Sequence, residues 1–384
     1  MLSATPVQRV LTCQPGRKRQ QRGMAARAAL ETDAVCERAA RLFLGDGPLK
    51  FSPTSGGVNN LARKRHRSCS VLTFSQVQYV ERGDGQRLVL RVYNNGSNTA
   101  RVRWEHAVLG ALAPHRAALS FAVPTPLPAL GSGASHVPLP DGAEASLFEL
   151  IPGGLPKLSC VFAIGKATGQ LTQVMSAIAA SKQLDSLPCP TAPYHDIYAV
   201  HHAVTPELFA STVAGPAFDS CREATTFLCK ELASIEAACA SFGSLPQSLI
   251  HGDLHYDNVL VLDGKVSGLL DFEFSARDYR AMELAICLSK YVGEPEPLPF
   301  LQDFIAGFAE GGGQLTPEEI AALPTLINLR VLSNVVYFVG RAAAGEDAIT
   351  SLTSRAETYA NRVRWVNAND KQLTAQLMAA LARQ

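Results

Sequence analysis

The sequence predicts an α+β fold with a small, strand-rich N-terminal part and a larger, helical C-terminal part. Apolar residues that alternate as in strands gather between residues 49 and 151, and a Pro/Gly-rich segment follows at residues 152–156. Most of the remaining chain is Ala-rich with helical spacing. Strands followed by helices, with a hinge between them, favour two packed lobes. We therefore expect an N-lobe over residues 31–151 and a C-lobe over residues 152–384.

The bulk composition indicates a soluble globular protein with an ample core. The chain has 384 residues, of which 47% are apolar and 18% charged, enough for a large core. A net charge of +1 gives no indication of a nucleic-acid partner, and we expect no membrane span. Nine cysteines without metal-ligand spacing predict reduced thiols and a reducing compartment.

The first 30 residues differ in composition from the rest of the chain. They contain several Arg and Lys residues, no acid before Glu31, and no apolar core of the secretory type. This composition is typical of an organelle transit peptide, and we expect the chloroplast, with the mitochondrion as the alternative organelle. A disordered tail on a cytoplasmic protein, or a true start at Met24, are the other interpretations.

Strands dominate the expected N-lobe. Two apolar-alternating runs flank the turn at Gly83–Gly85, which predicts a β-hairpin. The helix expected before these strands begins at a capping residue and ends at a glycine. The elements expected here are a helix over residues 32–45, strands over 49–52, 77–81, 87–93 and 146–151, and a helix over 101–112.

Residues 61–76 interrupt this pattern. All five residues from 63 to 67 are basic or His, between Asn60 and the hairpin. We interpret the segment as a non-functional insertion, because its removal joins the preceding Gly-rich loop directly to the strand. A phosphate-binding or targeting patch is the alternative.

Helical spacing resumes after the hinge and continues to the C-terminus. The last of these helices should break or bend near Asn367. The helices expected late in the chain cover residues 281–292, 298–311, 316–344 and 350–381.

The stretch over residues 249–274 carries the chemistry. Asp253 lies in a short loop, Asn258 begins a pair of strands, and Asp271 ends it. Phosphoryl transfer needs one carboxylate to receive a hydroxyl proton, and oxygen ligands for Mg²⁺. We expect Asp253 to be the base and Asn258 and Asp271 to be the Mg²⁺ ligands. His251 should brace the loop through backbone carbonyls.

A nucleotide site is expected from the N-lobe. Ser55, Gly56 and Gly57 lie between two expected strands, where glycine lets backbone N–H groups approach phosphates. Two glycines in a row are also a common turn. Residues Glu149 to Ile151 at the hinge would offer backbone groups and an apolar wall to adenine.

Arg91 is a charged residue within a strand of β-forming residues. It is either a surface residue of an amphipathic strand or the cation that holds the nucleotide phosphates. In the second interpretation, Glu105 from the following helix orients it through a bidentate pair.

These residues resemble the protein-kinase-like small-molecule phosphotransferases, the group of aminoglycoside phosphotransferases, choline kinases and type II homoserine kinases. The loop over residues 251–258 is similar to their catalytic loop, and residues 271–284 are similar to their metal-binding segment and its continuation. The resemblance implies a protein-kinase-like two-lobed fold, ATP and Mg²⁺ as cofactors, and the roles given above for Asp253 and Arg91. Glu273 stands where protein kinases have Gly, so a protein substrate is not expected.

The acceptor site is less defined by the sequence. Arg330, Asn334 and Tyr337 share one helix face, and a buried Arg there would suit a carboxylate such as that of homoserine. A choline-type acceptor would need an aromatic cage, for which this lobe offers only Trp365. We therefore expect a homoserine-like acceptor, with a choline/ethanolamine-type kinase or a nucleotide-binding pseudokinase without turnover as alternatives. Further acceptor-site candidates are His195, Asp196 and His201.

Overall fold

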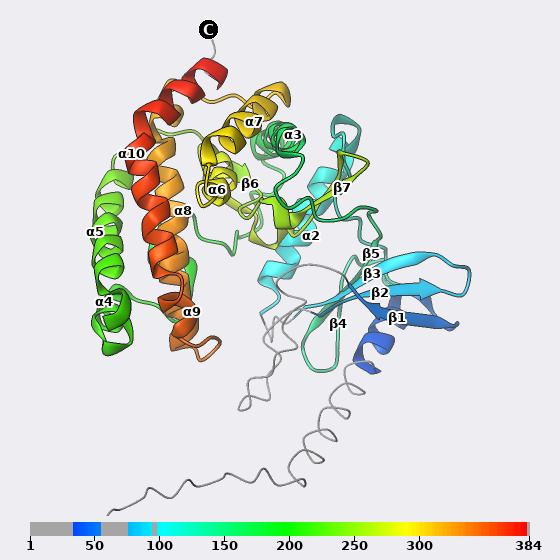
Figure 1. Ribbon diagram of the computed structural model, residues 1–384. Coiled ribbons are helices and arrows are strands. Elements are labelled where there is room, and N and C mark those ends of the chain that lie inside the picture. Colours follow the sequence, from blue (N-terminus) through cyan, green and yellow to red (C-terminus); the bar gives the residue numbers. More distant parts are fainter. Residues whose placement is uncertain (1–33, 55–75, 94–97, 382–384) are drawn as a thin grey trace, which may run out of the picture.

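The computed structural model describes residues 34–54, 76–93 and 98–381 (Figure 1). Within these ranges, a five-stranded antiparallel sheet forms the N-terminal part, and helices with two small two-stranded sheets form the rest. The predicted α+β class is thereby confirmed. The predicted transit peptide and residues 61–75 of the predicted insertion lie outside the described residues.

The N-terminal sheet contains the predicted hairpin. β2 and β3 pair antiparallel, with Val80 opposite Leu88, and β3 continues the sheet by pairing with β5. Residues 34–44 form a helix that packs Cys36, Ala40 and Phe43 against this sheet. The strands, in sheet order, are β1 (Leu49–Pro53), β2 (Gln76–Arg82), β3 (Arg87–Val92), β5 (Glu144–Glu149) and β4 (Val137–Pro138).

β3 separates its side chains between the two faces of the sheet. Leu88, Leu90 and Val92 are buried in the core under residues 34–44. Because side chains alternate along a strand, Arg91 points to the opposite face. The helix α2 (Ala100–Leu112) supplies Glu105 to that face, where Arg91 contacts both Glu105 and the C-terminal part.

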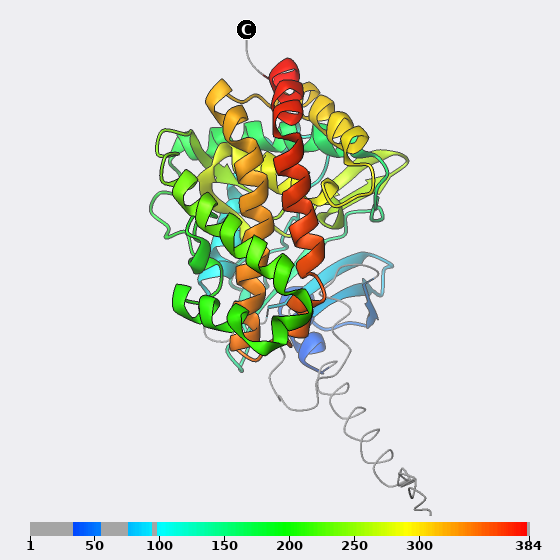
Figure 2. The ribbon, with the colours of Figure 1, turned by 60° about the vertical axis from the view of Figure 1, so that its left-hand side comes forward.

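The C-terminal part is a helical assembly with one continuous core. In two views, α5, α8 and α10 lie side by side, while α6, α7 and α3 lie on the inner side of this layer (Figures 1 and 2). The helices are α3 (Val161–Ser181), α4 (Pro206–Ala214), α5 (Arg222–Cys239), α6 (Arg280–Tyr291), α7 (Pro297–Glu310), α8 (Pro317–Ala343), α9 (Thr350–Thr353) and α10 (Ala356–Leu381). Short 3₁₀ turns cover Ala113–Ala118, Ile197–Val200, Pro216–Cys221, Tyr256–Asn258 and Phe272–Phe274.

The predicted break near Asn367 is wrong. The helix breaks earlier, at residues 354–355, and α10 runs unbroken through Asn367. The Asn367 amide accepts a hydrogen bond from Asn328 Nδ2 (2.7 Å) and donates to Glu231 Oε2 (2.9 Å). Asn disrupts a helix when its side chain competes for its own backbone, and here neighbouring helices satisfy the side chain instead.

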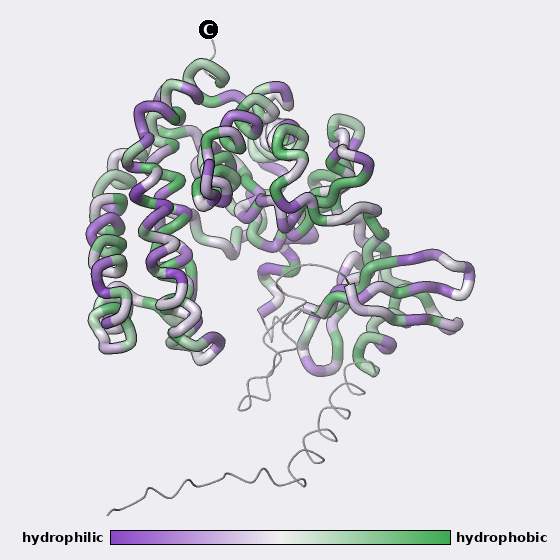
Figure 3. The backbone as a smooth tube through the Cα atoms, viewed as in Figure 1, coloured by the Kyte–Doolittle hydropathy of each residue, from purple (hydrophilic) through white to green (hydrophobic). Residues whose placement is uncertain are grey.

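α8 is the longest helix in the described part of the chain. A capping box between Thr316 and Glu319 starts it, with Pro317 at its first position. By length and composition α8 could cross a membrane, which the sequence analysis did not foresee. However, 67% of its most apolar window is buried inside the protein, as in the core helix of a globular protein, and Figure 3 shows hydrophobic and hydrophilic residues mixed along this helical layer.

The predicted hinge is hydrogen-bonded to the C-terminal part. Gly154 exchanges two backbone hydrogen bonds with Val261, at 3.0 and 2.9 Å. Ser267 Oγ donates to the Pro152 carbonyl at 2.6 Å. The segment that leaves the sheet is therefore anchored on the strand pair β7 (Val259–Leu262) and β8 (Lys265–Leu269).

Candidate active site

A tight turn presents Asp253. The strand β6 (Gln247–Ile250) pairs with β9 (Ala276–Tyr279), and the loop over residues 251–258 follows β6 directly. Gly252 has φ +82°, and a Cβ there would lie 2.2 Å from the Phe274 carbonyl oxygen. Only glycine fits this position. His251 and Asp253 are thus held on either side of a fixed turn.

Two residues brace this turn. His251 Nε2 bonds to the Leu270 carbonyl at 2.9 Å, as predicted, and His251 Nδ1 accepts from the Asp253 N–H at 3.3 Å. Glu283 of α6, fully buried, accepts a hydrogen bond from the His251 N–H. Burial raises the pKa of Glu283 to about 7, against the lowering effect of its backbone hydrogen bonds. Glu283 is not among the residues predicted from the sequence, although a lone acid inside an apolar helix was the available signal.

The two oxygens of Asp253 differ in how firmly they are held. Oδ1 accepts from Arg330 Nη2 at 2.8 Å. Oδ2 lies 3.5 Å from His255 Nε2 and 3.4 Å from Asn258 Nδ2, which are looser contacts. Burial alone would raise the pKa of Asp253, but His255, Arg330 and Lys290 outweigh burial and hold the pKa well below its usual range. Asp253 is therefore ionised, with Oδ2 the more available acceptor.

Asn258 and Asp271 are brought together by the strand pair. The Leu270 N–H donates to the Asn258 carbonyl at 2.9 Å, which sets Asn258 beside the residue preceding Asp271. Asn258 Nδ2 donates to the Asp253 carbonyl at 2.8 Å, so its amide oxygen is left as a possible metal ligand. Asp271 has φ +69°, a strained conformation for a non-glycine residue that often marks a functional site.

Arg91 connects the sheet to this segment. Its Nη1 lies 3.1 Å from Glu105 Oε1 and 3.3 Å from Asp271 Oδ1, and its Nη2 lies 2.6 Å from Glu273 Oε2. The predicted bidentate pair with Glu105 is therefore wrong: Nη1 alone contacts Glu105, because Nη2 binds Glu273. The predicted partner is correct, and Glu273 is a further partner that was not predicted.

This cluster is short of positive charge. Three carboxylates face the one guanidinium of Arg91, and the side chains are mostly buried. Burial, reinforced by Asp271 and Glu105, raises the pKa of Glu273 to about 8, although Arg91 opposes the shift. Glu105 Oε2 is buried without a hydrogen-bond partner. A divalent cation at Asp271 would offset the excess negative charge, so the donor set fits one.

The metal site that these residues offer is incomplete by itself. In the described ranges, no group of three His, Cys, Asp or Glu side chains is arranged to hold a metal ion. Mg²⁺ typically binds through one or two protein oxygens, with phosphates and water completing its shell. Asp271 and Asn258 fit that pattern, with a nucleotide as the remaining source of ligands.

Only some of the other residues predicted to bind the nucleotide lie in the part of the chain that the structure describes. Ser55, Gly56 and Gly57 lie outside the described residues. The Glu149 N–H donates to the Thr125 carbonyl at 3.0 Å, and Ile151 packs so close to Gly268 that a Cβ there would lie 2.6 Å from Ile151 Cγ2. A role for Glu149 and Ile151 in adenine binding stays a prediction.

One predicted acceptor residue contacts the catalytic loop. Besides Asp253, Arg330 binds Asn334, with Nη1 2.6 Å from Asn334 Oδ1. Tyr337 faces away from this pair, since its hydroxyl accepts from Arg341 Nη1 at 3.1 Å. The three residues therefore share a helix face but not a set of contacts.

The predicted histidines serve other contacts. His201 bonds to Glu346 at 3.5 Å, and His195 Nδ1 lies 3.7 Å from Asp278 Oδ1. Asp196 is exposed at the start of a 3₁₀ turn. Tyr194, their neighbour, does reach the loop, with its hydroxyl donating to the Gly252 carbonyl at 2.7 Å.

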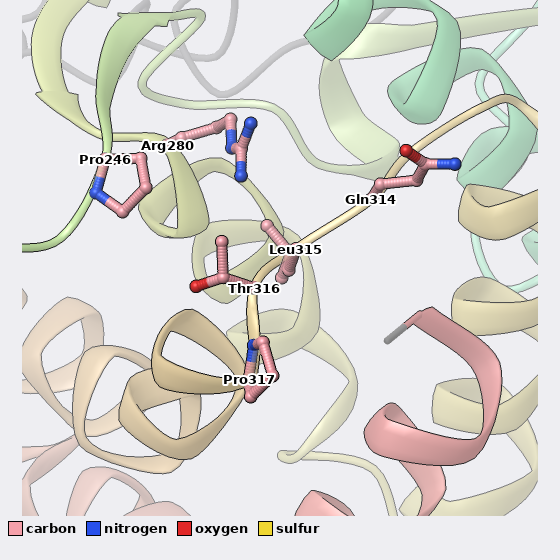
Figure 4. Close-up of a pocket in the computed structure, with 6 residues that line it drawn as sticks. All are labelled: Pro246, Arg280, Gln314, Leu315, Thr316 and Pro317. Atoms are coloured by element: carbon pink, nitrogen blue, oxygen red, sulfur yellow. The ribbon is translucent and has the colours of Figure 1, made fainter. Parts of the chain in front are cut away.

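A pocket of about 350 Å³ lies elsewhere (Figure 4). Pro246 and Arg280, which line it, flank the β6–β9 pair at the end remote from His251. Arg280 is paired with Glu319, with Nε 3.0 Å from Oε1. None of the candidate site residues lines this pocket.

The sequence is similar to known phosphotransferases. A family model described as "Phosphotransferase enzyme family" matches residues 73–323. A homoserine kinase of Gluconobacter oxydans is 38% identical over 137 residues, which are 33% of this chain and 43% of that relative. A homoserine kinase of Gluconacetobacter diazotrophicus is 25% identical over 257 residues, 65% of this chain and 72% of the relative. The chain thus spans less than half of the Gluconobacter oxydans relative.

Solved structures show the same fold at low sequence identity. An amicoumacin kinase in complex with AMP-PNP and Ca²⁺ aligns over 87% of this chain and 95% of its own, with a TM-score of 0.58 and 13% identity. A microcompartment-associated aminopropanol kinase aligns over 80% and 92%, with a TM-score of 0.52 and 19% identity. These likenesses confirm the predicted protein-kinase-like two-lobed fold.

Proposed function

We propose that this chain, which belongs to the phosphotransferase enzyme family, is an ATP- and Mg²⁺-dependent kinase that phosphorylates a hydroxyl of a small metabolite, with homoserine as the preferred acceptor. One observation carries the proposal. Hydrogen bonds tie Asp253 and Asn258 into one unit beside Asp271, and Arg91 from the sheet contacts Asp271. The relatives named as homoserine kinases and the neighbour bound to AMP-PNP and Ca²⁺ support the acceptor and the cofactor class.

Asp253 is the proposed base. Its loosely held Oδ2 accepts a hydrogen bond from the acceptor hydroxyl and orients the oxygen towards the γ-phosphorus. A carboxylate of lowered pKa is a weak base. It suits a loose transition state, in which the hydroxyl becomes acidic only as the new bond forms.

The remaining residues have proposed roles around the nucleotide. Asn258 and Asp271 would hold Mg²⁺, which when bound neutralises phosphate charge. Arg91 would hold the α/β-phosphates and Glu105 would orient it, while Ser55, Gly56 and Gly57 would cover the phosphates. Glu149 and Ile151 would border adenine.

A choline- or ethanolamine-type acceptor is the second candidate, and a charge argument opposes it. The Arg330 guanidinium lies directly beside Asp253 Oδ1, where a cationic acceptor would be repelled. A pseudokinase is opposed by the presence of Asp253, Asn258 and Asp271 together.

The proposal is tested by Mg²⁺-dependent ADP release over a panel of amino-acid and amino-alcohol acceptors, with Asp253→Asn as the control. Loss of a general base lowers kcat by roughly 10²–10⁴-fold, so only the unaltered protein should respond to an acceptor. ATP binding, measured by calorimetry, should persist in the variant. If no acceptor raises ADP release above the Asp253→Asn rate while ATP still binds, the kinase proposal fails.

We also propose, from the composition of residues 1–30, import into the chloroplast. A fluorescent protein fused behind these residues should enter chloroplasts in plant cells. Its accumulation in mitochondria or cytoplasm would contradict the assignment.

A further inference from the structure

Three cations form a connected group beside Asp253: Arg330 and Lys290 act on the charge of Asp253, and Arg362 acts on that of Lys290. Arg330 of α8 pairs with Asp253. Lys290, in the last turn of α6, and Arg362 of α10 make no hydrogen bond or ion pair with any of the residues that the structure describes. Mostly buried cations without partners are costly, so this arrangement calls for an anion from outside the chain.

The Arg330 guanidinium is already hydrogen-bonded to groups of the protein itself. Its Nη2 holds Asp253 Oδ1 at 2.8 Å and its Nη1 holds Asn334 Oδ1 at 2.6 Å. Its guanidinium also lies over the Tyr194 ring, 5.4 Å from the centroid. The carboxylate-binding role that the sequence suggests for Arg330 is therefore better filled by another residue, and Arg330 acts as a positioning residue for Asp253.

Arg362 lies where α6 ends. A Cβ at Gly293 would lie 2.3 Å from Arg362 Nε and 2.4 Å from Nη2, so the guanidinium rests flat against this glycine. The Nε atoms of both Arg362 and Arg330 are buried without a hydrogen-bond partner. The glycine is thus a place where the backbone makes room for a guanidinium, which indicates a built site rather than a side chain in solvent.

Lys290 is under the electrostatic influence of both arginines and of the catalytic loop. Burial lowers its pKa, and so do the charges of Arg330 and Arg362, while Asp253 and Asp257 raise it. Asp257 is partly exposed, and its Oδ2 also contacts His255 Nδ1 at 3.4 Å. The balance beside Asp253 is therefore positive.

We propose that Lys290 and Arg362 bind the carboxylate of the acceptor, which restricts the substrates to hydroxy acids and hydroxyamino acids. The inference rests on the proposed kinase function and names its substrate class. An acceptor held by its carboxylate between α6 and α10 would direct its hydroxyl towards Asp253 Oδ2. Acceptors without an anionic group, such as amino alcohols, would leave both cations unpaired.

Three acceptors distinguish which charged group of the substrate the protein recognises. L-Homoserine has hydroxyl, ammonium and carboxylate groups; 3-amino-1-propanol is the same molecule without the carboxylate, and 4-hydroxybutanoate is the same molecule without the ammonium. We expect kcat/KM to be highest for L-homoserine and to fall far more for 3-amino-1-propanol than for 4-hydroxybutanoate. Steady-state ADP release measures all three.

The variants are Lys290→Met and Arg362→Met, which keep side-chain length and remove charge. Losing one charged hydrogen bond to the acceptor should lower kcat/KM for L-homoserine by roughly 10–100-fold, mostly through KM. For Arg362→Met, the value for 3-amino-1-propanol and the KM for ATP should change by less than about 3-fold. Lys290→Met also removes a charge that holds down the pKa of Asp253, so for this variant kcat/KM should fall more for L-homoserine than for 3-amino-1-propanol. Arg364→Met is the matched control, because this residue of α10 pairs with Glu357 on the exposed side. It should leave all values unchanged.

Lys290→Arg restores the charge and should recover most of the homoserine activity, which a merely structural role for Lys290 would not require. Melting temperatures of all variants are measured alongside. Equal losses with both acceptors, or no loss with either, in folded Lys290→Met and Arg362→Met proteins would overturn the inference. If both variants fail to fold, the acceptor preference of the unaltered protein decides instead, and a preference for 3-amino-1-propanol would overturn it.

Calorimetric binding of L-homoserine, without turnover, distinguishes this inference from the kinase proposal. Binding that is weakened by Lys290→Met, in a protein that releases no ADP, would refute the kinase and support the carboxylate site. ADP release that is unchanged in Lys290→Met and Arg362→Met would support the kinase and refute the carboxylate site. A protein that neither binds nor turns over any carboxylate acceptor would refute the carboxylate site, and the kinase proposal would then be decided by the amino alcohols of the panel.

Discussion

At the scale of single residues, Arg91 links the two parts of the molecule. It lies on the central strand β3 of the N-terminal sheet and contacts Glu105, Asp271 and Glu273, so one side chain joins the sheet, α2 and the segment after β8. Its side chain is 12% exposed, which makes these contacts largely shielded from solvent. Removing a buried ion-pair partner leaves uncompensated charges behind, and this costs more than the pair itself contributes.

We therefore predict that Arg91→Met lowers the free energy of unfolding by about 3–5 kcal/mol at neutral pH, because Asp271 loses its counter-ion and the buried Glu105 and Glu273 lose the guanidinium that each contacts. Urea unfolding followed by circular dichroism measures the change. Arg87→Met is the control on the same strand, since Arg87 is exposed, and should change the value by less than about 0.5 kcal/mol. A loss below 1 kcal/mol for Arg91→Met would contradict the described cluster.

The buried carboxyl group of Glu283 should make the free energy of unfolding depend on pH. Its pKa rises from 4.5 to about 7 on folding, chiefly through burial. A carboxyl group with a raised pKa in the folded state stabilises the protein fully below pH 4.5, and this contribution is lost as the pH rises through 7. In Glu283→Gln, the decline in the free energy of unfolding between pH 5 and 8 should be smaller than in the unaltered protein, by up to about 3 kcal/mol.

Urea unfolding at closely spaced pH values measures this difference. Glu310→Gln, at an exposed position, is the control and should keep the slope of the unaltered protein. Equal slopes in Glu283→Gln and in the unaltered protein would show that Glu283 does not titrate in this way.

At the scale of secondary-structure elements, α3 and α7 pack through glycines. A Cβ at Gly165 of α3 would lie 2.2 Å from the Phe304 carbonyl oxygen, and a Cβ at Gly307 of α7 would lie 2.0 Å from the Phe162 carbonyl oxygen. Gly169 and Gly311 repeat the pattern one turn further along. The two backbones thus approach as closely as the absence of side chains allows, and even one methyl group would force them apart.

Gly165→Ala should therefore lower the free energy of unfolding by about 1–3 kcal/mol, despite the higher helix propensity of Ala. The control is Gly110→Ala in α2, where a Cβ would meet nothing within 4 Å. That variant should gain roughly 0.5–1 kcal/mol, because Ala loses less backbone entropy in a helix. Urea unfolding compares the two, and a change of the same sign in both would contradict the close approach of α3 and α7.

At the scale of the whole molecule, local patterns predicted most of the fold. Alternation and the Gly83–Gly85 turn predicted the β2–β3 hairpin, and apolar spacing predicted α6, α7 and α8 to within two residues at each end. These elements are set by neighbours in the sequence, which a pattern can register. A break was wrongly predicted near Asn367, because the partners that hold Asn367 within α10, Asn328 and Glu231, come from distant parts of the chain.

The residues of the candidate site also fall into those that a local pattern predicts and those that only helix packing brings together. Asp253, Asn258 and Asp271 lie within 19 residues of one another, so their shared motif predicted them together. Lys290 and Arg362 come from α6 and α10, and their proximity depends on helix packing that no local spacing encodes. Arg330 was predicted as a residue, but its contact with Asp253, 77 positions away, was not.

The central claim is that this molecule transfers the γ-phosphate of ATP to an acceptor hydroxyl with Asp253 as base. Phosphorus NMR of a reaction with ATP, Mg²⁺ and L-homoserine tests it most directly. We predict an ADP signal together with a phosphomonoester signal in equal amount, both dependent on Mg²⁺ and both lost in Asp253→Asn. ADP accompanied only by inorganic phosphate, or the same phosphomonoester at an unchanged rate in Asp253→Asn, would contradict the claim.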